Sequence, residues 1–252
     1  MKSAQHIFLG LCVLLLGGCS TKLPLTEEIS GEKLKQAEKK LIHFLDQSCV
    51  NAVDSDIKLS WHAYGQQETY PAVLQAMGPA SLRLALTDPL GRPLFLLASD
   101  GTTFTLADNS KSIGYTGSTE LQFIRRFLPE FIPSEDLFHW LSGRIHKKNM
   151  LQVASTRSDM KEQLHWYEVS ISQEANPIHL LALDKKNRLS RHMIVDKDND
   201  DILFDARYSS YRETTGECGW PGKIDLSGKA LEAEYSIEFT EIFNFSPIEE
   251  QR

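Results

Sequence analysis

The sequence lacks the features typical of nucleic-acid-binding proteins, of membrane proteins with several spanning helices and of proteins with zinc-binding or redox-active cysteines. Its 27 Lys and Arg residues are outnumbered by 34 Asp and Glu residues, and the net charge of −7 leaves no basic excess to neutralise phosphates, so we expect no nucleic-acid partner. Only one apolar run is long enough to concern a membrane, and because it lies at the N-terminus, a channel with several spanning helices is excluded. The four cysteines form no C-x-x-C pair, which argues against a zinc or redox site.

Common catalytic and metal-binding motifs are also missing. The chain has no G-x-S-x-G elbow, H-E-x-x-H pair, P-loop or dinucleotide fingerprint. An acidic run at residues 196–201 lacks the glycine and the closing glutamate of a calcium loop, and it predicts a solvated hairpin tip. Seven of the eight histidines lie beyond the N-terminal apolar run, dispersed along the chain. We interpret most of them as surface or strand-end residues: His43, His62, His139, His146, His165, His179 and His192. We therefore predict no enzyme, no cofactor and no metal site.

The N-terminus carries an export signal. Residues 7–16 are almost entirely apolar and too few for a spanning helix, and they end in Leu-Gly-Gly-Cys-Ser, which resembles a bacterial lipobox. An ordinary small-residue cleavage site is the alternative. The lipobox predicts a signal peptide over residues 1–18, acylation of Cys19 and a spacer over residues 19–29. In the lipoprotein pattern that this motif resembles, Ser20 rather than an acidic residue after the cysteine implies an outer-membrane anchor that leaves the protein facing the periplasm.

Two cysteines remain after this processing. Cys12 leaves with the signal and Cys19 takes lipid, so Cys49 and Cys218 are left as a pair in an oxidising compartment. A disulfide between them would close a loop of 169 residues. Two separate buried thiols are an equal alternative, because sequence gives no geometry.

The mature chain predicts one mainly β (α+β) domain over residues 30–252. Residues 30–45 place Leu34, Ala37 and Leu41 on one helical face, with Ser30 as the N-cap. Beyond residue 50 the apolar period changes to two, which predicts about ten or eleven antiparallel strands. Two short helices interrupt them, at about 121–128 and, after an N-cap at Ser134, at 137–141, and we expect them to cover one face of the sheet.

Several motifs carry a resemblance to a known family. Residues 87–91 (Thr-Asp-Pro-Leu-Gly), 99–101 (Ser-Asp-Gly), 115–117 (Tyr-Thr-Gly), 140–144 (Trp-Leu-Ser-Gly-Arg) and 220–226 (Trp-Pro-Gly-Lys-Ile-Asp-Leu) occur in the same order as in the LolA/LolB family of outer-membrane lipoprotein carriers and receptors. The chain is most similar to the LolB receptors. The resemblance implies a curved antiparallel half-barrel with lid helices around an apolar cavity for acyl chains.

The resemblance also implies roles for particular residues. Leu90 corresponds to a protruding leucine of the LolB receptors and would enter the membrane, although a leucine folded back on the core is an equal alternative. From alternation we expect nine residues to line the cavity: Trp61, Leu84, Leu96, Phe104, Trp140, Trp166, Ile224, Tyr235 and Ile237.

The predicted function is that of an outer-membrane-anchored monomer that binds acyl chains of lipoproteins or other lipids, with a periplasmic LolA-like carrier as a partner. The alternative is a structural or partner-binding envelope lipoprotein with a filled core. A hydrolase of envelope lipids is the third hypothesis. The helix at 30–45, the Cys49 and Cys218 pair and residues 150–201 have no clear counterpart in the family.

Overall fold

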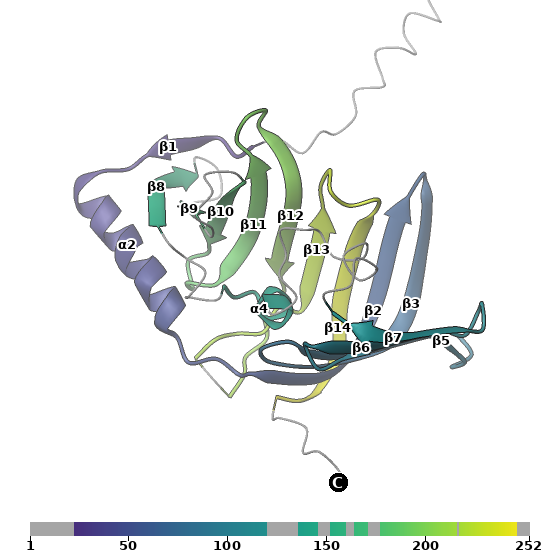
Figure 1. The fold of residues 1–252 in the computed structure, drawn as a ribbon. Coiled ribbons are helices and arrows are strands. Elements are labelled where there is room, and N and C mark those ends of the chain that lie inside the picture. The colour runs from purple at the N-terminus through teal and green to yellow at the C-terminus, as the bar shows by residue number, and fades with distance from the viewer. Residues whose placement is uncertain are drawn as a thin grey trace, which may run out of the picture.

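The computed structural model describes residues 23–119, 136–145, 152–159, 164–170, 177–215 and 217–245 (Figure 1). Cys19 and the rest of the predicted export signal, the predicted helix at 121–128, Ser134 and His146 lie outside the described residues. Among the described helices, none combines the length and the apolar character that crossing a bilayer requires.

The described residues form one antiparallel sheet of fourteen strands, in the order β1-β8-β9-β10-β11-β12-β13-β14-β2-β3-β4-β5-β6-β7. The strands are β1 (Thr26–Glu28), β2 (Ala52–Ala63), β3 (Gln66–Met77), β4 (Ser81–Thr87), β5 (Pro93–Ser99), β6 (Thr103–Asp108), β7 (Ile113–Ser118), β8 (Gln152–Asp159), β9 (His165–Ser170), β10 (Ile178–Leu183), β11 (Leu189–Asp196), β12 (Asp201–Ser209), β13 (Lys223–Ser227) and β14 (Glu234–Asn244). The sheet curls without closing, because β1 and β7 are its two edges. The predicted fold class is confirmed, but the predicted strand count is too low.

Two strands escaped prediction for different reasons. β1 lies in the predicted spacer. Its three residues pair with β8, with Thr26 opposite Asp159 and Glu28 opposite Arg157. β3 begins with a polar stretch, residues 66–69, that shows no apolar alternation, and it contains Pro71. The Thr87 hydroxyl donates to the carbonyl of Pro71, so the backbone of Pro71 faces the end of β4. At this position the strand ladder does not need the backbone N–H that proline lacks.

Two helices pack on one side of this sheet. α2 (Gly31–Asp46) follows Ser30, the predicted N-cap residue, although the Ser30 side chain makes no capping hydrogen bond. Its buried residues Ala37, Leu41 and Phe44 recur at helical spacing and face the core, as predicted. α4 (Leu137–Ser142) begins after Asp136 and ends at Gly143 in the left-handed conformation, with a φ of 65°. Figure 1 shows the sheet curving around both helices.

The strand register separates an inner face, which packs against α2 and α4, from an outer face. Ile57, Leu74, Leu181 and Phe239 belong to the large core cluster of the inner face. A second, smaller cluster lies on the outer face of β9 to β12, and it contains Trp166, Ala182, Met193, Val195 and Ile202. Because side chains alternate along a strand, each strand of this half contributes to both clusters.

Candidate functional site

The inner face of β3 to β6 carries an aligned apolar row. Leu74 pairs with Leu84, Leu84 with Leu97, and Leu97 with Leu106, so four leucines lie side by side across four strands. Leu84 and Leu97 remain only half-buried. We call these four residues the leucine row.

The apolar surface around the leucine row is also incompletely covered. Leu82, Leu86 and Phe95 flank the row on the same face and are half-buried as well. On the edge strand β7, Ile113 is 39% exposed and Tyr115 is 44% exposed. Half-exposed apolar side chains on adjacent strands form a surface that gains free energy when an apolar ligand covers it.

The other half of the inner face is filled by the protein itself. The Tyr167 hydroxyl on β9 donates to the carbonyl of Ala37 in α2, at 2.8 Å. Trp140 of α4 stacks on the His192 ring at a centroid distance of 4.2 Å and meets Phe204 edge-on at 5.0 Å. The two helices therefore occupy the space above β9 to β12 that a ligand would need.

Two histidines lie within this filled half. Nδ1 of His179 lies 2.9 Å from Nε2 of His192, so one ring donates a hydrogen bond to the other. Burial lowers the pKa of His179 to about 4, and burial together with the neighbouring His179 holds the pKa of His192 well below its ordinary value. The pair is therefore neutral at pH 7. The expectation that the histidines are mostly surface or strand-end residues is wrong for these two, because β10 and β11 bring them together beneath α4.

Seven of the nine predicted cavity residues lie on or over the inner face. They are Trp61, Leu84, Phe104, Ile224, Tyr235 and Ile237 on the strands and Trp140 on α4. Trp61 lies opposite Tyr235, and Ile237 lies opposite Ile224. Whether these residues line a lipid cavity remains a prediction.

The other two predicted residues point the opposite way. Leu96 pairs with Ala85 and Ala107 in the outward register, one position out of step with the leucine row. Trp166 belongs to the outer cluster, where its indole nitrogen donates to Asp159. The inward assignment of both was wrong. Tyr167 and Val169, which were not among the predicted cavity residues, are the inward residues of β9.

A hollow of about 630 Å³ opens at the ends of β3 to β6. Phe104 and Leu82 contribute to it, but most of its lining residues, among them Gln75, Arg83 and Thr105, lie in the outward register. With an arginine and several hydroxyl and amide groups around it, this hollow suits an acyl chain less well than the leucine row does.

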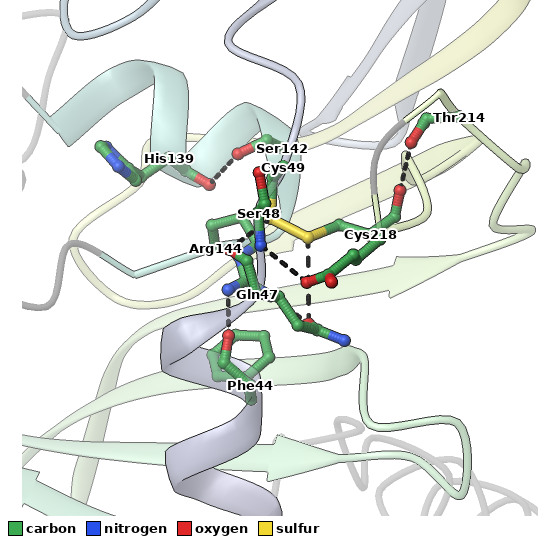
Figure 2. Close-up of a disulfide and its surroundings, with 10 residues drawn as sticks. Phe44, Gln47, Ser48, Cys49, His139, Ser142, Arg144, Thr214 and Cys218 are labelled. Carbon is green, nitrogen blue, oxygen red and sulfur yellow. Dashed lines mark hydrogen bonds between the residues drawn. A yellow bond between two sulfur atoms is a disulfide. The ribbon is translucent and has the colours of Figure 1, made fainter.

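The end of α2, the end of α4 and a distant loop are fastened together (Figure 2). Cys49 and Cys218 form a disulfide across 169 residues, with their Cα atoms 5.2 Å apart. Arg144, just after α4, donates to Gln47 at 2.8 Å and to the carbonyl of Phe44, and its guanidinium lies 4.1 Å from the centre of the Phe44 ring. Burial lowers the pKa of Arg144 to about 10, so it stays charged at pH 7. These contacts hold the helices over the filled half.

The turn between β4 and β5 presents Leu90, which is 80% exposed. The Asp88 carboxylate accepts hydrogen bonds from the backbone nitrogens of Leu90 and Arg92, both at 2.9 Å, and from Nε of Arg92 at 2.6 Å. The bond from the Arg92 backbone contributes most to lowering the pKa of Asp88. Gly91 has a φ of +79°. The loop is therefore held rigid by its own polar groups, while its apolar tip points into open space.

The same loop geometry recurs between β10 and β11. Asp184 accepts from the backbone nitrogens of Lys186 and Arg188, at 2.8 and 2.9 Å, and from Nε of Arg188 at 2.9 Å. Asn187 has a φ of +60°, at the position that Gly91 holds in the first loop. The two turns share a pattern, Asp-x-x-Gly/Asn-Arg, and differ at the tip, where one has a leucine and the other a lysine.

The sheet and its two helices define the class of the fold, an open half-barrel of the LolA type. No protein-family model and no curated protein matches the sequence. A domain from Vibrio parahaemolyticus provisionally assigned to outer membrane lipoprotein sorting matches the structure with a TM-score of 0.54 and 12% identity, over 86% of this chain and 94% of that one.

Two further solved structures are similar. A LolA superfamily protein from Nitrosomonas europaea has a TM-score of 0.50 and 13% identity, over 82% of this chain and 91% of its own. A DUF1329 family protein from Desulfovibrio piger has a TM-score of 0.54 and 9% identity, over 84% and 93% respectively. At these identities the comparisons establish the shared fold.

Proposed function

We propose that this protein is a lipid-anchored lipoprotein of the outer membrane that binds acyl chains, of lipoproteins or of other lipids, against the leucine row. The observation that carries the proposal is the unequal covering of the inner face: α2 and α4 fill one half, while inward apolar side chains of β4, β5 and β7 remain partly exposed. On β6 the inward residues Phe104 and Leu106 are buried. An acyl chain laid on this surface would gain about 0.8 kcal/mol for each methylene group removed from water. The protein would bind and pass on the lipid without making or breaking a covalent bond.

Two further features support reception at the membrane. The lipobox at residues 16–20 would anchor the chain through Cys19, and the rigid loop at residues 88–92 presents Leu90 outward. We propose that Leu90 enters the bilayer when cargo is delivered, contributing about 1.5 to 3 kcal/mol if fully buried. Cargo would arrive from a periplasmic carrier of similar fold, and transfer between two such apolar surfaces changes the buried area little, so small differences in affinity set its direction.

A matched pair of leucines tests the binding surface. Leu84 and Leu96 are both half-buried and lie on adjacent strands, but Leu84 faces inward and Leu96 outward. We expect Leu84→Ser to reduce the amount of lipid retained by the purified full chain, measured by native mass spectrometry, and Leu96→Ser to leave it unchanged. If neither the parent nor either variant carries lipid, and no added fatty acid binds, the alternative of a structural or partner-binding envelope lipoprotein is favoured instead.

A further inference from the structure

The turn between β2 and β3 exposes an aromatic side chain that the fold does not use. Tyr64 is 98% exposed, and it forms a two-residue turn with Gly65 between the paired residues Ala63 and Gln66. Both turn residues have positive φ values, +52° for Tyr64 and +76° for Gly65. Turns of this type favour Asn or Asp before the glycine, and a bulky residue with positive φ is an outlier. Tyr64 therefore adopts a disfavoured backbone conformation without gaining burial.

Tyr64 and Leu90 lie at the same edge of the sheet, meaning the line of strand ends and not the edge strands β1 and β7. β2 and β4 both pair antiparallel with β3, so they run in the same direction, and the turns that follow them leave the sheet at the same strand ends. The β2–β3 hairpin extends further than β4, because β3 pairs with β4 only from Ala72 onward and with β2 from Gln66 onward. A Cβ placed on Gly65 or Gly91 would meet nothing within 4 Å, so open space surrounds both turns. The two most exposed large apolar or aromatic side chains of the described residues thus end neighbouring hairpins.

Charge at the two tips is low. Residues 62–67, His-Ala-Tyr-Gly-Gln-Gln, contain no Lys, Arg, Asp or Glu. Beside Leu90, the charges of Asp88 and Arg92 compensate one another across 2.6 Å. The tip residues themselves therefore have no unpaired charge to strip of water on entering the headgroup region. The nearby carboxylate of Glu234 lies two residues below Tyr64, 3.8 Å from Nδ1 of His62. Tyrosine favours the membrane interface, where its ring is in contact with apolar groups and its hydroxyl with water, and leucine favours the hydrocarbon below.

We propose that Tyr64 is a second membrane contact, which docks this edge of the sheet on the bilayer together with Leu90. The inference rests on the proposed function, since Leu90 is its first contact, and it adds an orientation: two separate tips fix the angle of the sheet to the membrane, which one tip cannot do. The loop at residues 184–188, which follows β10, lies at the opposite edge. An odd number of antiparallel pairings separates β10 from β4, so the two strands run in opposite directions. The tip residue of this loop, Lys186, is exposed and charged, and it provides the control position.

The experiment places an environment-sensitive fluorophore at one position at a time. Tyr64→Cys, Leu90→Cys and Lys186→Cys variants of the full lipidated chain, with the Cys49–Cys218 disulfide intact, are labelled with a nitrobenzoxadiazole dye. They are then reconstituted into vesicles of phosphatidylethanolamine and phosphatidylglycerol with or without nitroxide-bearing lipids. We expect the nitroxide to quench the dye at positions 64 and 90 and to leave the dye at position 186 bright.

The other outcomes separate this inference from the proposed function. Quenching at 90 alone overturns the role of Tyr64 and leaves the proposed function standing, whereas quenching at neither tip removes the membrane contact from both. Equal quenching at all three positions, or at 186 alone, also overturns the orientation. If the dye at 64 is shielded from water without being quenched by the nitroxide, a protein surface covers it, and the bilayer is the wrong partner.

A second variant separates docking from stability. Tyr64→Asn introduces a residue that the turn favours, so we expect the melting temperature to rise, by about 2 °C. The same substitution in the Leu90→Cys background should reduce quenching of the dye at position 90. A lower melting temperature would mean that Tyr64 supports the fold, and unchanged quenching at position 90 would mean that it does not help to dock the edge. Either result overturns the inference.

Discussion

At the residue scale, the two similar loops at Asp88 and Asp184 allow the contribution of the loop's hydrogen bonds to stability to be distinguished from the role of its tip residue. Both carboxylates accept three corresponding hydrogen bonds, from the backbone two and four residues later and from Nε of an arginine, and Asp184 accepts a fourth from Nη2 of Arg188. The tips differ in chemistry and lie at opposite edges of the sheet. Each loop is therefore the natural control for the other.

We expect Asp88→Ala and Asp184→Ala to lower the melting temperature by similar amounts, because each leaves the same loop nitrogens without their acceptor. Only Asp88→Ala should impair delivery of lipoproteins to the outer membrane, since only that loop presents Leu90. Leu90→Glu should impair delivery without a loss of stability. Fractionation of cells expressing each variant, paired with thermal unfolding of the purified proteins, measures both effects. Equal delivery by Asp88→Ala and Asp184→Ala would count against the membrane role of the loop.

The buried histidine pair makes stability depend on pH. In the unfolded chain His179 takes up a proton at its ordinary pKa of 6.5, whereas in the folded protein it does so only at about 4. Its contribution is therefore complete above pH 6.5 and is lost as the pH falls towards 4, by about 3 kcal/mol in total. His192, with a pKa well below its ordinary value, acts in the same direction.

Urea unfolding at pH 7.5 and pH 4.5 measures this dependence. We expect His179→Gln, which keeps a polar side chain but does not titrate, to show a smaller difference between the two pH values than the parent protein does. His62→Gln is the control, because His62 lies on the exposed end of β2. An unchanged difference in His179→Gln would show that the histidine pair does not govern the acid sensitivity.

The register errors also belong to the residue scale. Residues 94–98, Leu-Phe-Leu-Leu-Ala, are all apolar, so alternation cannot say which side chains face inward, and Leu96 was assigned to the wrong face. Trp166 and Tyr167 are adjacent aromatics, and the larger one was taken as the inward one. Leu84 lies between Arg83 and Ala85 on a strand with clearer alternation, and its inward assignment agrees with the strand register. The face of the sheet to which a side chain points can be predicted from sequence only where polar residues alternate with the apolar ones along the strand.

At the element scale, prediction succeeded where one pattern filled a whole element. α2 shows apolar residues at helical spacing from Leu34 to Leu45, and its limits match the prediction closely. β3 could not be found, because its first half is polar and pairs with β2 beyond the end of β4. The pairing of β14 with β2 is likewise invisible in the sequence, since nothing local relates residues about 180 positions apart.

The disulfide fastens α2 to the loop before β13, and its removal tests how much that connection contributes. In the chain-entropy description a closed loop of 169 residues stabilises the fold by up to about 5 kcal/mol. We expect the Cys49→Ser, Cys218→Ser double variant to lose about 2 to 5 kcal/mol of unfolding free energy in urea. The parent protein under reducing conditions should match it. No loss in either would mean that the hydrogen bonds of Arg144 to α2 hold this junction without the covalent link.

At the scale of the whole molecule, the sheet has a filled half and an open half. Hydrogen exchange should therefore be faster in β4 to β7 than in β9 to β12, because local opening is easier where fewer side chains cover the backbone. Bound lipid should slow exchange in β4 to β7 and leave β9 to β12 unchanged. Mass-spectrometric exchange on delipidated and lipid-loaded protein measures both. Uniform protection across the sheet would contradict the division into two halves.

The order of the strands also shows where the two parts of the sheet depend on each other. Strands β2 to β7 are one continuous meander and β8 to β14 another, and they join only where β14 meets β2. The earlier meander holds the open half, and its first strand, β2, has no second neighbour until β14 pairs with it. A chain truncated before residue 234 cannot form this junction, and it would leave β2 as an exposed edge strand. The last strand therefore decides whether the two meanders form one sheet, and its loss would leave an unpaired strand edge that can pair with another chain.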